Sequence, residues 1–103
     1  MTDRELLDMA AKAAELTLWE YSESDEGLFI HDDKLIKVWN PLINDGDALR
    51  LAVKLELFVA PHGRGTYVAG EIPFLREEYD DDPYAATRRA IVRAAAEIGK
   101  GME

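Results

Sequence analysis

Residues 39–55 constrain the fold more than any other part of the chain, because several local signals agree there on one succession of elements. Residues 34–39 are rich in β-favouring side chains and end in Trp39, which predicts a strand. The strand ends at Asn40 and Pro41, since proline has no amide hydrogen to donate and disfavours helix in the residue before it. This stretch therefore predicts a strand followed at once by a turn.

An amphipathic helix is expected directly after this turn. Asn44 or Asp45 can cap its free amides, and Asp47 lies in its first turn, where the helix dipole favours negative charge. Asp47 and Arg50 are three residues apart, a spacing that allows an ion pair. The expected buried face consists of four residues at helical spacing, Ala48, Leu51, Ala52 and Leu55.

Two further helices are expected near the ends of the chain. Thr2 and Glu5 form a capping-box pattern ahead of the apolar positions in residues 3–15. Asp82 and Pro83 are a typical cap and first residue for the last helix, which Gly99 is expected to end.

Five strands are expected between these helices, over residues 16–21, 28–31, 34–39, 57–60 and 66–72. A five-residue loop over residues 61–65, with two glycines that need positive φ, joins the last two strands. Residues 73–82 are expected to be irregular. The order α-β-β-β-α-β-β-α predicts one α+β domain over residues 1–103, with an antiparallel sheet of about five strands and helices on one side. The other face of the sheet is expected to be solvated or to form a homodimer.

Composition excludes several classes of function. The 103 residues contain no cysteine, which removes disulfides, thiolate nucleophiles and cysteine zinc sites. The apolar stretches are too short for a membrane span, and the charged N-terminus lacks the apolar core of a signal peptide. We therefore expect a cytoplasmic protein without membrane contact.

The net charge of −9 predicts long-range repulsion of nucleic-acid phosphates and attraction of a partner with a basic surface. Acidic residues gather in residues 20–33 and 71–82, which serve either solubility alone or recognition of that partner. Trp39 joins the candidates if it is exposed beside Pro41 and Tyr67. The candidate partner-binding residues are Glu23, Asp25, Glu26, Glu77, Glu78, Asp80, Asp81 and Trp39.

The alternative functions have less support in the sequence. Arg88, Arg89 and Arg93 form a basic stripe that suits nucleic-acid binding, although pairing with the protein's own carboxylates, or a place at the rim of an interface, explains them better. His31 and His62 are too few for a metal site, and residues 62–65 suit a hairpin turn better than a phosphate loop. No nucleophile with a neighbouring base stands out, so we expect no catalytic, metal or cofactor site. A small enzyme or ligand-binding domain remains the third alternative.

Three segments resemble a group of small phage and prophage proteins. They are the helix of residues 5–14, the central Trp-Asn-Pro-Leu at 39–42 followed by Asp-Gly-Asp-Ala-Leu-Arg-Leu-Ala-Val-Lys-Leu at 45–55, and the helix of residues 84–92. The resemblance implies a phage or prophage origin and supplies no activity. It makes a non-enzymatic accessory protein the expected function, acting in the host cytoplasm by binding a host protein, with anti-defence activity such as CRISPR inhibition as one version.

Overall fold

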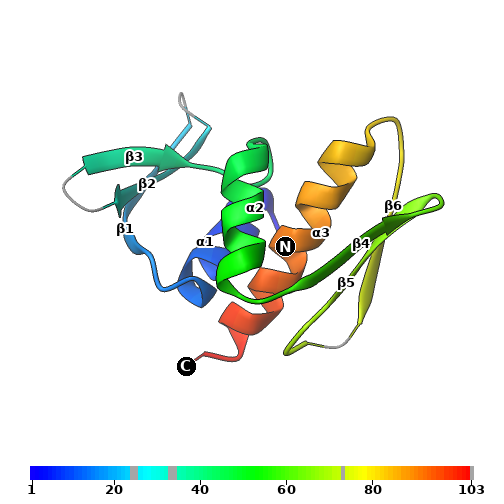
Figure 1. Ribbon diagram of the computed structural model, residues 1–103. Helices are drawn as coiled ribbons and strands as arrows, with labels where there is room; N and C mark the ends of the chain where they lie inside the picture. The colour runs from blue at the N-terminus through cyan, green and yellow to red at the C-terminus, as the bar shows by residue number, and fades with distance from the viewer. Residues whose placement is uncertain (24–25, 33–34, 73, 103) are drawn as a thin grey trace.

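The computed structural model describes residues 1–23, 26–32, 35–72 and 74–102, and over them the chain is an α+β structure of three helices and six strands (Figure 1). The three helices and the α+β class agree with the sequence-based prediction. The elements in order are α1 (Asp3–Ala13), β1 (Thr17–Ser22), β2 (Gly27–Asp32), β3 (Leu35–Trp39), α2 (Asp45–Lys54), β4 (Phe58–His62), β5 (Gly65–Ala69), β6 (Leu75–Glu78) and α3 (Pro83–Lys100).

The single sheet of about five strands is wrong, because the strands form two separate sheets. The first sheet has the order β1-β2-β3 and the second the order β4-β5-β6, and every pairing within them is antiparallel. Figure 1 shows the helices between the two sheets instead of on one side. After β3 the chain turns into α2, and the strands that follow pair only with one another and pack on α3.

Strand β6 lies in a region that the sequence predicts to be irregular. It pairs with β5, so that Glu77 faces Thr66 and Arg76 faces Tyr67. The Arg76 guanidinium carbon lies 5.4 Å from the centre of the Tyr67 ring. Charged residues are common on edge strands because they discourage pairing with another chain. In β6 they replace the alternation of apolar and polar residues by which a strand is predicted from sequence.

The β4–β5 hairpin turns more tightly than the predicted five-residue loop. His62 pairs with Gly65, which leaves only Gly63 and Arg64 in the turn. Gly63 has φ of +67°, as predicted. The same explanation is wrong for Gly65, where a Cβ atom would lie 2.9 Å from the backbone carbonyl oxygen of Glu77. Gly65 is therefore required for the close approach of β6 to β5.

All three helix N-termini are capped as the sequence predicts. The Thr2 amide donates to Glu5 Oε1 at 3.0 Å and the Glu5 amide donates to Thr2 Oγ1 at 3.1 Å. Hydrogen bonding of the Glu5 carboxylate to the Thr2 backbone amide, and then to the Thr2 side chain, lowers the pKa of Glu5 below its ordinary value. Asn44 caps α2, and Asp82 caps α3 with proline at the first helical position.

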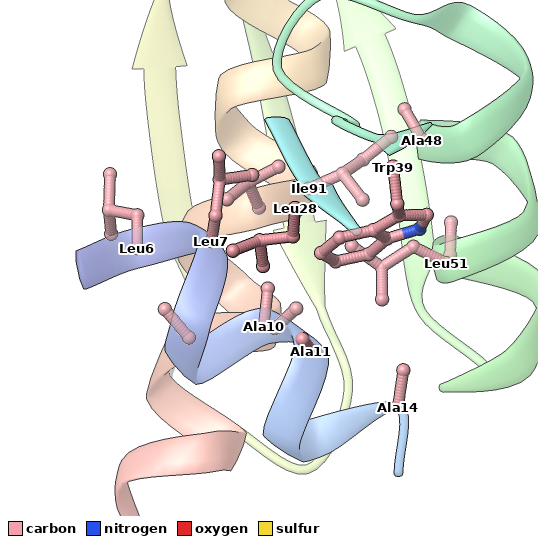
Figure 2. Packing of buried hydrophobic residues seen from close by; sticks show 14 of the residues in the cluster. Leu6, Leu7, Ala10, Ala11, Ala14, Leu28, Trp39, Ala48, Leu51 and Ile91 are labelled. Atoms are coloured by element: carbon pink, nitrogen blue, oxygen red, sulfur yellow. The ribbon is translucent and has the colours of Figure 1, made fainter. Parts of the chain in front are cut away.

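The main hydrophobic core lies between the helices and the first sheet. Figure 2 shows Leu7 of α1, Leu28 of β2, Trp39 of β3, Leu51 of α2 and Ile91 of α3 in one cluster. Elements far apart in sequence thus contribute to a single apolar interior, which is the main source of stability for a chain of this size.

A buried polar network fixes the place where β3 passes into α2. Asp47 is 5% exposed, and its Oδ2 accepts the backbone amide of Asn40 at 3.0 Å. Asp47 Oδ1 accepts from Arg50 at 2.7 Å, which confirms the predicted ion pair. The Asn40 side chain donates to the Glu26 carbonyl at 2.6 Å and accepts the Leu42 amide at 2.9 Å. Asp47 therefore does more than initiate the helix: it ties α2 to the first sheet.

Replacing Asp47 by alanine is expected to lower the free energy of unfolding by about 2–3 kcal/mol, because a buried amide and a guanidinium both lose a charged acceptor. Asp45→Ala is the matched control, since Asp45 is an exposed residue of the same helix turn whose ion pair with Arg88 is worth at most about 1 kcal/mol. Urea unfolding followed by circular dichroism measures both values. Equal losses in the two variants would show that the Asp47 network does not join α2 to the sheet.

Gly99 does not end α3, contrary to the sequence-based prediction. The helix continues to Lys100 and Gly101 caps it. Gly99 is needed where α1 and α3 cross, because a Cβ atom there would lie 1.9 Å from the carbonyl oxygen of Met9. Alanines line both helices at this crossing and let the two backbones approach closely.

Gly99→Ala is therefore expected to destabilise the protein by at least about 2 kcal/mol, because the new methyl group forces two backbones apart. Gly101→Ala is the control: its Cβ atom would have its nearest neighbour at 3.5 Å and its φ is −80°. That change should be neutral or stabilise the protein by about 0.5 kcal/mol. Thermal unfolding of the two variants compares them directly, and a Gly99→Ala melting temperature equal to the wild-type value would refute the close crossing.

Candidate functional site

The described acidic residues of the β1–β2 hairpin, Glu23 and Glu26, are exposed. Glu23 follows β1 and Glu26 precedes β2. Glu26 has φ of +53°, and its carbonyl oxygen holds the Asn40 side chain, so its backbone has a structural role. Asp25 lies outside the described residues. The two described carboxylates point to no particular ligand.

The second acidic group lies on β6 and the connection from it to α3. Glu77 forms an ion pair with Arg93, and Glu78, 82% exposed, pairs with Arg76 at 2.9 Å. The Tyr67 hydroxyl and then Glu78 raise the pKa of Arg76 above its ordinary value. Asp80 and Asp81 are exposed and follow directly. This group therefore combines paired carboxylates with exposed ones.

The two acidic groups do not form one face. Figure 1 shows the β1–β2 hairpin on one side of α2 and the β6–α3 connection on the other. A partner that contacts both would have to extend around α2. We therefore treat residues Glu77, Glu78, Asp80 and Asp81, the β6–α3 acidic segment, as a separate candidate surface.

Trp39 belongs to the core and not to a surface patch. Its side chain is 5% exposed and packs among residues of α1, α2 and α3. The prediction that Trp39 contacts a partner required an exposed indole, and the indole is buried. Trp39 is therefore not part of the candidate binding surfaces. Its position at the end of β3 explains instead why residues 39–55 are so constrained.

The arginines of α3 each bind a carboxylate of the protein itself. Arg88 donates to Asp45 at 2.7 Å and to the Leu42 carbonyl at 2.8 Å. Arg89 donates to Asp3 at 2.8 Å, and Arg93 pairs with Glu77. This confirms the structural explanation of the basic stripe, since every one of the three guanidinium groups is partly neutralised.

The two histidines lie on different sheets, His31 on β2 and His62 on β4. Within the described ranges, no group of three or more histidine, aspartate or glutamate side chains is placed to hold a metal ion. The glycine turn at Gly63 joins two strands and not a strand to a helix, so it lacks the geometry of a phosphate loop. In the described part of the chain, none of the helices has the length and apolar character needed to cross a bilayer.

An apolar groove lies between α2, α3 and β4, and we call it the α2–α3 groove. Its volume is about 460 Å³. Leu49, 64% exposed, and Tyr84, 71% exposed, stand beside it on the two helices. The residues that line it are Asp45, Ala48, Leu49, Ala52, Val59, Pro61, Tyr79, Pro83, Tyr84, Thr87, Arg88 and Ile91.

Apart from the exposed Tyr84 hydroxyl, the polar side chains of the groove already bond within the protein. Thr87 Oγ1 lies 2.6 Å from Thr66 Oγ1, and Thr66 Oγ1 donates to the Tyr79 hydroxyl at 3.2 Å. Arg88 is held by Asp45 and the Leu42 carbonyl. The groove therefore offers an occupant apolar contact and few free hydrogen-bonding groups.

One feature of the sequence is consistent with an apolar groove beside α2. Helix α2 carries Leu49 and Val53 beside its buried stripe, which is more apolar surface than one packed face needs. Two members of that stripe, Ala48 and Ala52, are small and leave space where they face α3. Both alanines are buried, as the sequence predicts, and the groove beside them depends on how α3 packs against α2, which the sequence does not show.

The exposed apolar residues of β3 are divided between the two faces of the strand, with Ile36 and Val38 on one face and Leu35 on the other. Leu35, Ile36 and Val38 lie on this edge strand of the first sheet. The expected homodimer through this sheet stays a prediction, and the net charge of −9 opposes the approach of two copies.

Comparison with known proteins adds no relative from which a site could be transferred. No protein-family model matches the chain, and neither a curated protein nor a solved structure does.

Proposed function

We propose that the protein is a non-enzymatic interaction module that binds a partner protein through the α2–α3 groove and the β6–α3 acidic segment. The observation that carries this proposal is the apolar lining of the groove, whose polar side chains, apart from the exposed Tyr84 hydroxyl, already have partners. Catalysis and recognition of polar substrates need free, convergent polar groups. A surface of this kind instead favours docking of an apolar segment.

The occupant that fits best is an amphipathic helix. The groove volume lies within the range of about 300–1,000 Å³ that is typical of binding sites. Its walls are two helices, and a third helix can pack between them by the usual interlocking of side-chain ridges. The exposed Leu49 and Tyr84 extend the apolar surface beyond the hollow, which suits a partner longer than a small molecule.

Charge specifies the partner further. Tyr79, Pro83 and Tyr84 line the groove, so Asp80 and Asp81 lie next to it along the chain. Lysine or arginine beside the apolar face of the partner helix would meet these exposed carboxylates. The net charge of −9 adds long-range attraction of a basic partner and disfavours a second copy of this chain as the occupant.

The resemblance to phage and prophage accessory proteins makes a host protein the proposed partner, met in the host cytoplasm. Inhibition of a defence system such as CRISPR is the specific version of this proposal, since a small acidic module can block a basic surface. Nucleic-acid binding through Arg88, Arg89 and Arg93 gains no support from geometry, because all three side chains are engaged by carboxylates.

Site-specific photo-crosslinking in the bacterial host tests the proposal. A photoreactive phenylalanine analogue replaces Leu49 beside the groove or, as a control, Val53, which is 69% exposed on the same helix but does not line the groove. A host protein crosslinked from position 49 and not from position 53 is the expected result. Equal crosslinking from both positions, or a product that nuclease treatment removes, would overturn the proposal.

With the purified partner, Leu49→Glu is expected to weaken binding at least about tenfold, because it places a charge in an apolar contact. Val53→Glu has the same chemistry outside the groove and should change affinity less than about twofold. Fluorescence anisotropy measures both dissociation constants. Equal effects of the two substitutions would place the contact elsewhere on the protein.

The double substitution Asp80→Lys/Asp81→Lys is expected to slow association about three- to tenfold and to reduce its dependence on salt. Glu56→Lys/Glu71→Lys changes the net charge equally at the opposite end of the second sheet, where Phe58 pairs with Ala69. Stopped-flow association rates at two salt concentrations compare the pairs. If both double substitutions act alike, only the overall charge matters and the acidic segment is not a contact surface.

A further inference from the structure

A second hollow of about 160 Å³ lies between the first sheet, the end of α1 and the face of α2 that points away from the groove. Its apolar lining includes Trp39 and Leu51, which lie near Ala14 in Figure 2. Its polar lining is entirely basic: His31, Lys37, Arg50 and Lys54. No residue of this lining belongs to the α2–α3 groove, so the two hollows lie on different sides of α2.

The concentration of basic side chains is unexpected in a protein with a net charge of −9. Among the described residues, no carboxylate lines this hollow. His31 and Lys37 already make contacts within the protein, so the charge available to a ligand rests on Arg50 and Lys54. Arg50 gives one of its five N–H donors to Asp47 and is 65% exposed along its side chain.

The position of Lys54 has a simple structural explanation that covers only part of the pattern. Lys54 lies in the last turn of α2, where the helix dipole favours a cation by a few tenths of a kcal/mol or more. The dipole does not apply to Arg50 one turn earlier, which pairs with Asp47 through one N–H group and keeps further donors at the same hollow.

The size of the hollow indicates how large the apolar part of a ligand can be. An apolar cavity of about 150 Å³ is large enough for a benzene ring. Here Ile30, Trp39 and Leu51 would contact the ring, while Arg50 and Lys54 at the rim would meet an anionic substituent. We propose that this hollow is a binding site for a small aromatic anion, with the ring on the apolar residues and a carboxylate or phosphate at Arg50 and Lys54.

This site is independent of the proposed function, and its ligand does not have to be present for the groove to bind a partner. NMR titrations of the intact, isotope-labelled protein test it with four probes: benzoate, phenyl phosphate, inorganic phosphate and benzyl alcohol. Benzoate or phenyl phosphate is expected to give saturable shifts at the backbone amides of residues 50–54. Inorganic phosphate lacks the ring and benzyl alcohol lacks the charge, so both should bind at least about fivefold more weakly.

Two lysine substitutions distinguish binding at this hollow from general electrostatic attraction of the anionic probes to the protein. Lys54→Gln is expected to weaken binding of the anionic probes at least about fivefold, whereas Lys100→Gln should change it less than about twofold. Lys100 is the matched control because it also lies in the last turn of its helix, away from this hollow. Leu49→Glu, which alters only the groove, should leave probe binding unchanged.

Several outcomes would overturn the inference. Equal weakening by Lys54→Gln and Lys100→Gln would mean that the probes respond to overall charge. Benzyl alcohol binding as tightly as benzoate would remove any role for Arg50 and Lys54. Inorganic phosphate binding as tightly as phenyl phosphate would remove any role for the ring, and shifts that do not saturate would show that there is no site.

Discussion

The contact between the Asp47 carboxylate and the Asn40 amide is the constraint on which the rest of the structure depends. A buried carboxylate is stable only when its oxygens are hydrogen-bonded, and here both are. Through Asn40 the same network reaches the start of β2, so the first sheet and α2 hold a fixed relation. The fixed position of α2 against the first sheet holds the Trp39 side chain in the core, where it fills the space between the sheet and the helices.

Helix α2 has different surroundings on each of its faces. Its buried stripe packs into the core, one flank borders the apolar groove and the other borders the basic hollow. The chemistry of the flanks is opposite: Leu49 extends an apolar surface, whereas Arg50 and Lys54 supply charge. One ten-residue helix thus separates two surfaces that suit different ligands.

Local chemistry made the helices predictable, and long-range geometry made the sheets and hollows unpredictable. Caps at Thr2, Asn44 and Asp82 act within a few residues, so their signals are complete in the sequence. The same strands can form one sheet or two, depending on which strand edges pair. The alternation of apolar and polar residues along a strand does not specify that pairing. Gly65 and Gly99 were misassigned for the same reason, because each accommodates a neighbour distant in sequence. The groove and the basic hollow depend on how far α2 stands from α3 and from the first sheet, and no local pattern records that distance.

The crossing of the first and last helices determines when the protein can fold during synthesis. Asp3 binds Arg89, and Met9 rests against Gly99, so α1 finds its main packing partner only after all of α3 has been made. Until then α1 and the first sheet lack the helix that closes their core. The core between α1, the first sheet and α3 therefore depends on contacts between residues far apart in sequence, which are slow to form.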